Sequence, residues 1–164
     1  SMLLMGINMI DNHPLDSASV SELSNTPNGY LPETHPKMGS SPSKHLTKPV
    51  VLGQAANGLR VFIDAFKPSA ASFDVYYRTT SDPEENIYDK HFVRVEAENE
   101  VPDNVFNPET FVRKKAVFNE YRYLIGGEDG TLPDFTKFQI KVVMKSTNTC
   151  EIPLIKSIRA IALI

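Results

Sequence analysis

The strongest constraint on the fold is an alternation of apolar and polar residues with period two, which follows a proline-rich start. In LRVFIDAF, residues 59–66, every second residue from Leu59 is apolar, while Arg60 and Asp64 fall on the opposite face. Successive side chains of a β-strand point to opposite faces of a sheet, so this pattern predicts a strand with one buried face. Residues 72–80, SFDVYYRTT, alternate in the same way, and the KPSAAS turn between the two segments predicts a hairpin or an adjacent pair.

Further segments carry the same strand signature, with aromatic and β-branched residues bounded by turn-rich spacers. They are LTKPVVL (46–52), HFVRVE (91–96), VFNEYRYLI (117–125), FTKFQIKVVMK (135–145) and LIKSIRAIAL (154–163). The sequence shows no long amphipathic helical stretch. Together these segments predict an all-β fold, an antiparallel two-sheet β-sandwich of jelly-roll-like type. A barrel, or an α+β fold that contains a helix, is the alternative.

Residues 1–44 differ in composition from the rest of the chain. Prolines recur between residues 11 and 44 among many Ser, Thr and Asn residues, and such a segment cannot sustain a long helix or a central strand. Only residues 16–25 could form a short helix. We therefore divide the chain into an extended Pro- and Ser-rich arm, 1–44, and a β-sandwich domain, 45–164. A disordered linker is the alternative for the arm, although its apolar first ten residues favour an arm that pairs with or wraps a neighbour.

The segment LIKSIRAIALI, residues 154–164, is the most apolar of the predicted strands. As a bare edge it would be an aggregation hazard. We therefore expect it to lie between two strands with both faces covered, or to be covered by a partner chain. Lys156, Ser157 and Arg159 interrupt the apolar run and predict one hydrated patch on the strand.

The residue types that carry catalysis or bind metals show no pattern for either. His13, His35, His45 and His91 have no metal-ligand spacing, and the sequence contains no G-x-S-x-G and no glycine-rich phosphate loop. The single Cys150 excludes an internal disulfide and a thiolate zinc site. We therefore predict no catalytic residue, no metal site and no cofactor. The net charge of −3 gives no reason to expect nucleic acid, and no apolar run reaches the roughly 20 residues of a membrane span.

The carboxylates and the tyrosines suggest two further hypotheses about function, the first for acidic loops and the second for sugar binding. Acidic residues cluster in predicted loops, where pairs of carboxylates could hydrolyse glycosides or bind calcium. None has the register of a calcium loop, so solvated loops are the favoured interpretation and a glycoside hydrolase fragment is a minor alternative. Tyr88, Tyr121 and Tyr123 could stack on sugar rings, as in a carbohydrate-binding module. The chain has no Trp, which weakens that hypothesis, and packing in the core is the competing role.

Three motifs follow one another in order: SKHLTKPVVL (43–52), GLRVFIDAFKPSAASFDVYYRT (58–79) and FTKFQIKVVMKSTNTCEIPLIKSIRAIAL (135–163). Together they resemble a module at or near the C-terminal end of tail and baseplate proteins of contractile-tailed bacteriophages, marine phages included. The matching features are the K-P turn at residues 67–68, D-V-Y-Y at residues 74–77 and an S-x-N turn at residues 146–148. His45 departs from the pattern, which prefers an aromatic residue there, and residues 97–115 match no part of it.

The resemblance implies a non-enzymatic structural domain of the virion, placed in a phage tail or baseplate and made in the host cytoplasm. Its partners would be other tail or baseplate proteins, and self-association, for instance as a trimer, fits that setting. The contacts are expected to come from the arm and the closing strand, at Leu3, Leu4, Ile7, Ile161 and Leu163. A carbohydrate-binding module for adhesion to the host surface, with a host glycan as its ligand, is the alternative.

Overall fold

The computed structural model describes residues 3–4, 31–105, 107, 109, 117–127, 132–148 and 150–164. Its elements are, in chain order, β1 (Leu3–Leu4), β2 (Lys44–Leu46), β3 (Val50–Ala56), β4 (Gly58–Phe66), β5 (Ala71–Thr80), the 3₁₀ helix η1 (Ile87–Asp89), β6 (Val93–Val95), β7 (Asn119–Gly126), β8 (Phe135–Ser146) and β9 (Leu154–Leu163). The short helix expected at residues 16–25 lies outside the described residues.

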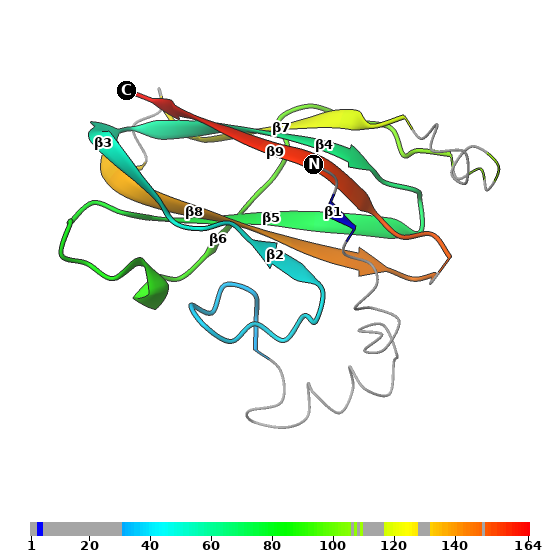
Figure 1. Ribbon diagram of the computed structural model, residues 1–164, viewed down its shortest axis with the longest axis horizontal. Helices are drawn as coiled ribbons and strands as arrows, with labels where there is room; N and C mark the ends of the chain where they lie inside the picture. The colour runs from blue at the N-terminus through cyan, green and yellow to red at the C-terminus, as the bar shows by residue number, and fades with distance from the viewer. Residues whose placement is uncertain are drawn as a thin grey trace.

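The strands form two sheets that pack face to face (Figure 1). Sheet A has the order β1-β9-β4-β7, and sheet B has the order β2-β8-β5-β6, with β3 also paired to β8. Every pair of neighbouring strands is antiparallel. The predicted antiparallel two-sheet β-sandwich is therefore confirmed.

The core lies between the sheets and follows the alternation of the sequence. Leu59, Val61 and Ile63 of β4 are completely buried, and they face Ile140 and Val142 of β8 across the core. Removing apolar surface from water stabilises the fold by about 25 cal/mol per Å². The two inner faces thus supply the main driving force for folding.

The prediction that residues 59–66 and 72–80 form a hairpin or an adjacent pair is wrong. β4 belongs to sheet A and β5 to sheet B, and the turn between them, where the Ala71 N–H donates to the Pro68 carbonyl at 2.9 Å, crosses from one sheet to the other. Both edges of β4 are already occupied, by β7 and β9, along nearly its whole length. A K-P turn is compatible with a hairpin and with a crossing between sheets. The pairing is therefore decided by which strands occupy the two edges of β4.

The prediction of a single strand at residues 46–52 is also wrong. The structure has two strands there, β2 and β3, and both pair with the same edge of β8. Pro49 has no N–H to donate at the break. Thr47 keeps the ladder continuous there: its N–H donates to the Ile140 carbonyl at 2.9 Å, and its hydroxyl accepts from the Ile140 N–H at 3.0 Å. The result is one interrupted edge strand.

The outer face of sheet B is covered by residues 31–43, here called the strap, which lie below the sheet in Figure 1. The Phe92 N–H donates to the Thr34 carbonyl, and the Met144 N–H donates to the Ser43 carbonyl, each at 2.9 Å. This cover explains why nearly every residue of β8 is buried, on both faces of the strand. Alternation alone predicts only one buried face.

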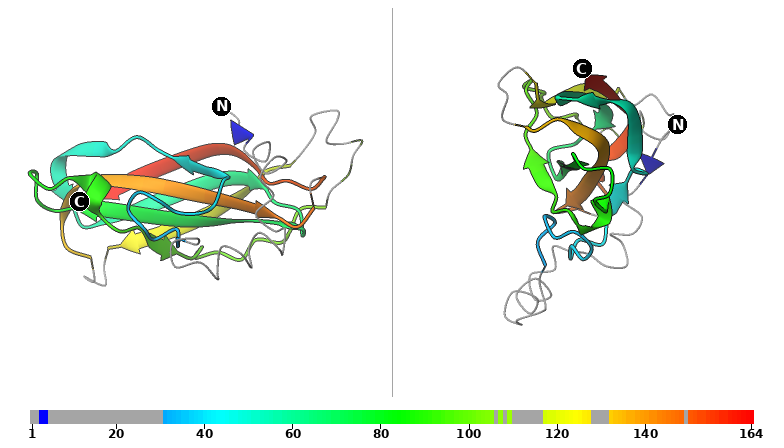
Figure 2. Two further views of the ribbon diagram at one scale, coloured as in Figure 1. Left: turned by 90° about the horizontal axis from the view of Figure 1, so that it is seen from below. Right: turned by 90° about the vertical axis from the view of Figure 1, so that its left-hand side faces the viewer.

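The sandwich has two long sides, which differ in the strands they expose (Figure 2). β9, β2 and β3 lie along one side, called the β9 side, and β6 and β7 lie along the other, called the β7 side. The loop between β6 and β7 runs beside β7, where the Glu98 N–H donates to the Arg122 carbonyl at 2.8 Å and the Arg122 N–H donates to Asn99 Oδ1 at 2.9 Å. The edge of β7 is therefore covered.

Candidate functional site

The outer edge of β9 differs from that of β7 in having little cover. β9 pairs with β4 along its whole length on one edge. On the other edge β1 pairs only with Leu154 and Ile155. Within the described part of the chain, residues 156–163 of β9 therefore present an edge with no neighbouring strand. Such an edge is a template for pairing with another chain.

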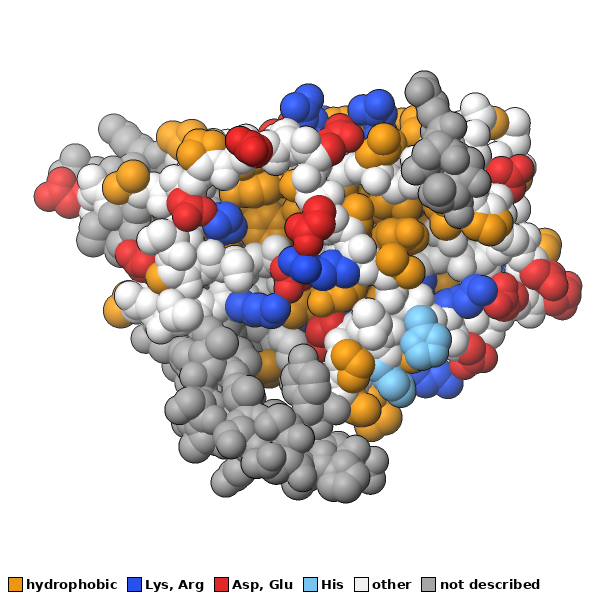
Figure 3. All heavy atoms as spheres, turned by 180° about the vertical axis from the view of Figure 1, so that it is seen from behind, with side chains coloured by type: hydrophobic (Ala, Val, Ile, Leu, Met, Phe, Trp, Pro, Cys, Tyr) orange, Lys and Arg blue, Asp and Glu red, His pale blue; other side chains and the backbone are white. Residues whose placement is uncertain are grey.

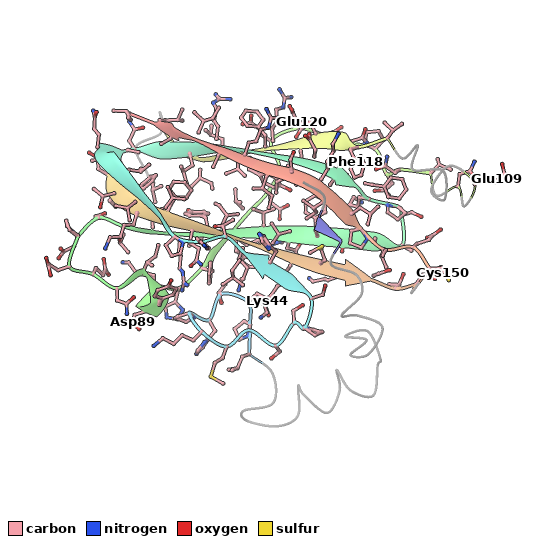
Figure 4. All side chains as sticks on the ribbon, viewed as in Figure 1. Lys44, Asp89, Glu109, Phe118, Glu120 and Cys150 are labelled. Carbon is pink, nitrogen blue, oxygen red and sulfur yellow. The ribbon has the colours of Figure 1, made fainter. Side chains whose placement is uncertain are left out.

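The outward side chains of β9 change character along the strand. In the middle of the strand, Ser157 donates to Asp64 at 2.8 Å, and Arg159 lies 3.1 Å from Glu120, whose side chain points away from sheet B (Figure 4). Ile161 of β9 and Ile164, directly after the strand, follow and are 54% and 74% exposed. The strand therefore combines a polar segment with an apolar end.

Sheet B also has exposed apolar side chains on its strands of the β9 side. Val50 and Val51 of β3 are 40% and 69% exposed, and Leu46 of β2 is 42% exposed. Leu46 pairs with Lys141 and points to the outer face of sheet B, whereas Ile161 pairs with Arg60 and points to the outer face of sheet A, so exposed apolar side chains flank the β9 side on both sheets. We call the β9 edge and these side chains the β9 surface.

Of the residues predicted for assembly contacts, the structure places two pairs at opposite ends of one strand. Leu3 and Leu4 pair with Ile155 and Leu154 at the start of β9. Ile161 is exposed near its end, beside the partly buried Leu163. Ile7 lies outside the described residues. Among the described residues, the prediction that β9 lies between two strands is correct for Leu154 and Ile155, which have β4 on one edge and β1 on the other.

A hollow of about 160 Å³ opens on the β7 side, between the edges of the two sheets. Figure 3 shows this side, with apolar side chains recessed between acidic and basic ones. Phe73 and Val75 of β5 form part of its wall, together with Val95 of β6. Tyr121 and Tyr123 of β7 complete it from sheet A. β6 pairs only with Val75 to Tyr77, so among the described strands none pairs with β5 beside Phe73 on this edge.

Charged side chains surround the hollow and neutralise one another. Arg94 lies 3.1 Å from Asp74 and 2.9 Å from Glu96, and Lys67 pairs with Asp103. Two acidic residues after β6 therefore have basic partners, Glu96 with Arg94 and Asp103 with Lys67. Among the described residues, no group of His, Cys, Asp and Glu has an arrangement that could hold a metal ion.

Two of the three tyrosines predicted to contact glycans line this hollow, but they do so from within the core. Tyr121 and Tyr123 are only 6% and 5% exposed, and the Tyr121 ring packs edge-on against Phe73 with 4.9 Å between the ring centroids. The Tyr121 hydroxyl is buried without a hydrogen-bond partner. Burial, followed by the charge of Asp103, raises the pKa of Tyr121 to about 12, and burial also raises the pKa of Tyr123. Both hydroxyls therefore keep their protons.

Tyr88, the third predicted glycan contact, lies elsewhere, on the outer side of sheet B. Its ring is stacked against Arg78, with 5.5 Å from the guanidinium carbon to the ring centroid. Arg78 is 2% exposed and donates to the Tyr88, Lys90 and Pro36 carbonyls. Half of the Tyr88 surface is exposed. Tyr88 therefore belongs to the cover of sheet B and is separate from the other two tyrosines.

The strap contains a buried ionic cluster that sequence reasoning missed. Glu33 lies 2.9 Å from Lys44 and 3.2 Å from Lys141, and it accepts from the Ser41 N–H at 2.8 Å. Burial raises the pKa of Glu33, but the Ser41 N–H and the two ammonium groups outweigh it, so the pKa lies below the usual 4.5. Burial lowers the pKa of Lys141, and Glu33 opposes that effect.

Perturbed pKa values can mark active sites. Here the charged groups satisfy one another, and Lys141 also lies 4.2 Å from the centroid of the Phe92 ring. Glu33 and Lys141 are 108 residues apart in the sequence, so no local pattern could have found the pair. We interpret the cluster as the attachment of the strap to sheet B.

The chain was compared with family models, with curated proteins and with solved structures, and none of them matches it. In the part of the chain that the structure describes, no helix is long and apolar enough to cross a membrane. Among the described residues, the geometry offers the β9 surface and the hollow on the β7 side as candidate sites.

Proposed function

We propose that this chain is a non-enzymatic assembly domain that binds protein partners through the β9 surface, as part of a bacteriophage tail or baseplate. The observation that carries the proposal is the edge of residues 156–163, which has no neighbouring strand among the described residues. The phage setting rests on the three ordered motifs at residues 43–52, 58–79 and 135–163.

Strand addition is the binding mode that this edge supports. A partner strand beside residues 156–163 would gain backbone hydrogen bonds with the exposed edge, and its side chains would meet Ile161 and Ile164. At about 3.3 Å per residue, the edge is long enough for a strand of ordinary length. The exposed charges of Lys156 and Arg159 oppose indiscriminate pairing, which is how natural edge strands limit aggregation.

The setting and the binding mode can be tested separately. The genes on either side of the one that encodes this chain are expected to encode sheath, tube or baseplate proteins. Neighbours of another kind, with no tail gene among them, would contradict the phage setting. The proteins of these neighbouring genes are also the probes for the binding test.

Each neighbouring protein is purified and mixed with the chain, and complex formation is measured by light scattering after size exclusion. A partner is expected to slow amide hydrogen exchange in residues 156–163. Ile161→Asp is expected to weaken binding by about tenfold or more, as for a buried contact in an interface. Leu124→Asp is the matched control, because Leu124 is exposed on β7, at the covered edge of the same sheet. If neither a neighbour nor a second copy binds, or if protection appears on another edge, the proposal is wrong.

A further inference from the structure

The core-facing side of β9 is incompletely covered along its free edge. Ala160 pairs with Val61 and Ile158 pairs with Ile63, and both Val61 and Ile63 are completely buried. Opposite residues of antiparallel strands point to the same face of a sheet, so Ala160 and Ile158 also point toward sheet B. Ala160 is nevertheless exposed, and Ile158 is only half-buried. A strand added to this edge would therefore cover core-facing surface as well as backbone.

The available length of the edge restricts how a second copy of β9 could pair with it. β1 already occupies the edge beside Leu154 and Ile155. The edge from Lys156 to Ile164 is open within the described part of the chain, and Ala160 is its midpoint. If a two-fold axis perpendicular to the sheet passes beside Ala160, two copies of this segment can pair antiparallel over its whole length, and neither displaces β1.

Other positions of the axis fit less well. An axis at Arg159 would place two guanidinium groups opposite each other, and it would bring Ile164 of one copy against Leu154 of the other, where β1 lies. An axis at Ile161 would leave Lys156 without a partner. Like charges directly opposite each other destabilise a sheet, and each lost pair of residues removes a stabilising contact. The length and the charges of the edge therefore both select Ala160.

The register about Ala160 keeps like charges from facing each other directly. Lys156 lies opposite Ile164 of the second copy, and Arg159 lies opposite Ile161 of the second copy. The two Arg159 side chains are diagonal neighbours, and each has its own carboxylate partner, Glu120, at 3.1 Å. Ile161 is 54% exposed in the single chain. In the dimer, the aliphatic part of Arg159 from the second copy would cover it.

We propose that the β9 edge pairs with a second copy of itself, as an antiparallel two-fold dimer with Ala160 at the axis, so that sheet A continues from one copy into the other. This inference rests on the proposed function, because it names the partner of the same edge. A pair of single strands is a small interface, at the low end of the sizes of specific complexes. The dimer is therefore expected to be weak, with a Kd of about 10 μM.

The oligomeric state of the full chain is measured by sedimentation velocity over a concentration range that brackets this Kd. We expect a reversible equilibrium between monomer and dimer, with slower amide hydrogen exchange in residues 156–164 at high concentration. Ile161→Asp is expected to weaken the dimer by about tenfold or more, because it places a carboxylate in the interface. Leu124→Asp, at the covered edge of β7, should leave the equilibrium unchanged.

Cysteine substitution tests the register. In a background that carries Cys150→Ser, Ala160→Cys should form a disulfide between two copies when diamide is added, because residues on the axis lie opposite each other within disulfide distance. Ala162→Cys is the matched control, because Ala162 is on the same strand and points to the same face. In this register it lies opposite Ile158 of the second copy, too far from the second Ala162 for a disulfide.

The inference is overturned if the chain stays monomeric at every concentration, if it forms a trimer or a larger assembly, or if Ala162→Cys cross-links as readily as Ala160→Cys. Hydrogen exchange needs no variant, so protection on another edge overturns the inference even where a variant fails to fold. A monomeric chain that binds the protein of a neighbouring gene at residues 156–163 would overturn the choice of partner and leave the proposed function standing. If neither a second copy nor a neighbour binds, both proposals are wrong.

Discussion

Replacing Glu33 by Gln should detach the strap from sheet B, and its cost can be worked from the structure. The carboxylate is the charge partner of Lys141, whose side chain is only 3% exposed. Removing one member of a buried ion pair typically costs 3–5 kcal/mol, because the other charge stays buried. Lys44 is 22% exposed and contributes at the smaller scale of surface pairs. Lys141 retains the Phe92 ring and the carbonyl of residue 33. We therefore expect a loss of about 3 kcal/mol from the free energy of unfolding, at the lower end of that range.

The measurement is urea unfolding at neutral pH, followed by circular dichroism, for Glu33→Gln, Lys141→Met and the double variant. If the two side chains stabilise each other, the double variant should lose less than the sum of the single losses, by at least about 1 kcal/mol. Removing both charges leaves no buried ion without a partner. A loss below about 1 kcal/mol for Glu33→Gln, or single losses that add within about 0.5 kcal/mol, would refute this account of the strap.

Three further predictions concern acid, the core and a turn. The folded pKa of Glu33 lies below 4.5, so its contribution to stability is fully present above that pH and is lost as the pH falls through the folded pKa. When the unfolding free energy is measured at decreasing pH, Glu33→Gln should therefore lose less stability than the unaltered chain. Ile155→Ala should cost about 2–5 kcal/mol in urea unfolding because Ile155 is completely buried, whereas Ile161→Ala should stay within about 0.5 kcal/mol. Gly126 has a φ of 66°, so Gly126→Ala should lower the unfolding free energy by about 1–2 kcal/mol. Gly53→Ala is the control and should be neutral in the same assay, because a Cβ added there meets nothing within 4 Å. Equal effects at the two glycines would contradict the prediction.

The inner faces of the sheets could be predicted from sequence because they depend only on local alternation. Leu59, Val61 and Ile63 occupy the face that their spacing assigns to them. Strand pairing could not be predicted in the same way. The turn at residues 67–70 is compatible with a hairpin and with a crossing between sheets, and the edges taken by β7 and β9 decide between them.

The strap and the hollow depend on contacts between distant parts of the chain. Glu33 lies in a proline-rich segment whose composition gives no sign of a buried ion pair with Lys141. The alternation around Tyr121 predicts a residue packed in the core, and that prediction is correct. The lack of a hydrogen-bond partner for its hydroxyl depends on how β5, β6 and β7 are arranged, so the sequence alone does not reveal it. Pro49 was the one local signal for the break between β2 and β3, since a proline inside a strand pattern indicates an interruption.

The order of the strands also has a consequence for how the chain is made. β8 is the partner of β2, β3 and β5, and β9 is the partner of β4. β4 can pair with β7, and β5 with β6, before residue 135 is made, but β2, β3 and one edge each of β4 and β5 lack their neighbours until residues 135–163 have been synthesised. Such chains fold slowly and depend on chaperones when concentrated. Truncation within the last strand should therefore yield insoluble protein, even though the rest of the sequence is intact.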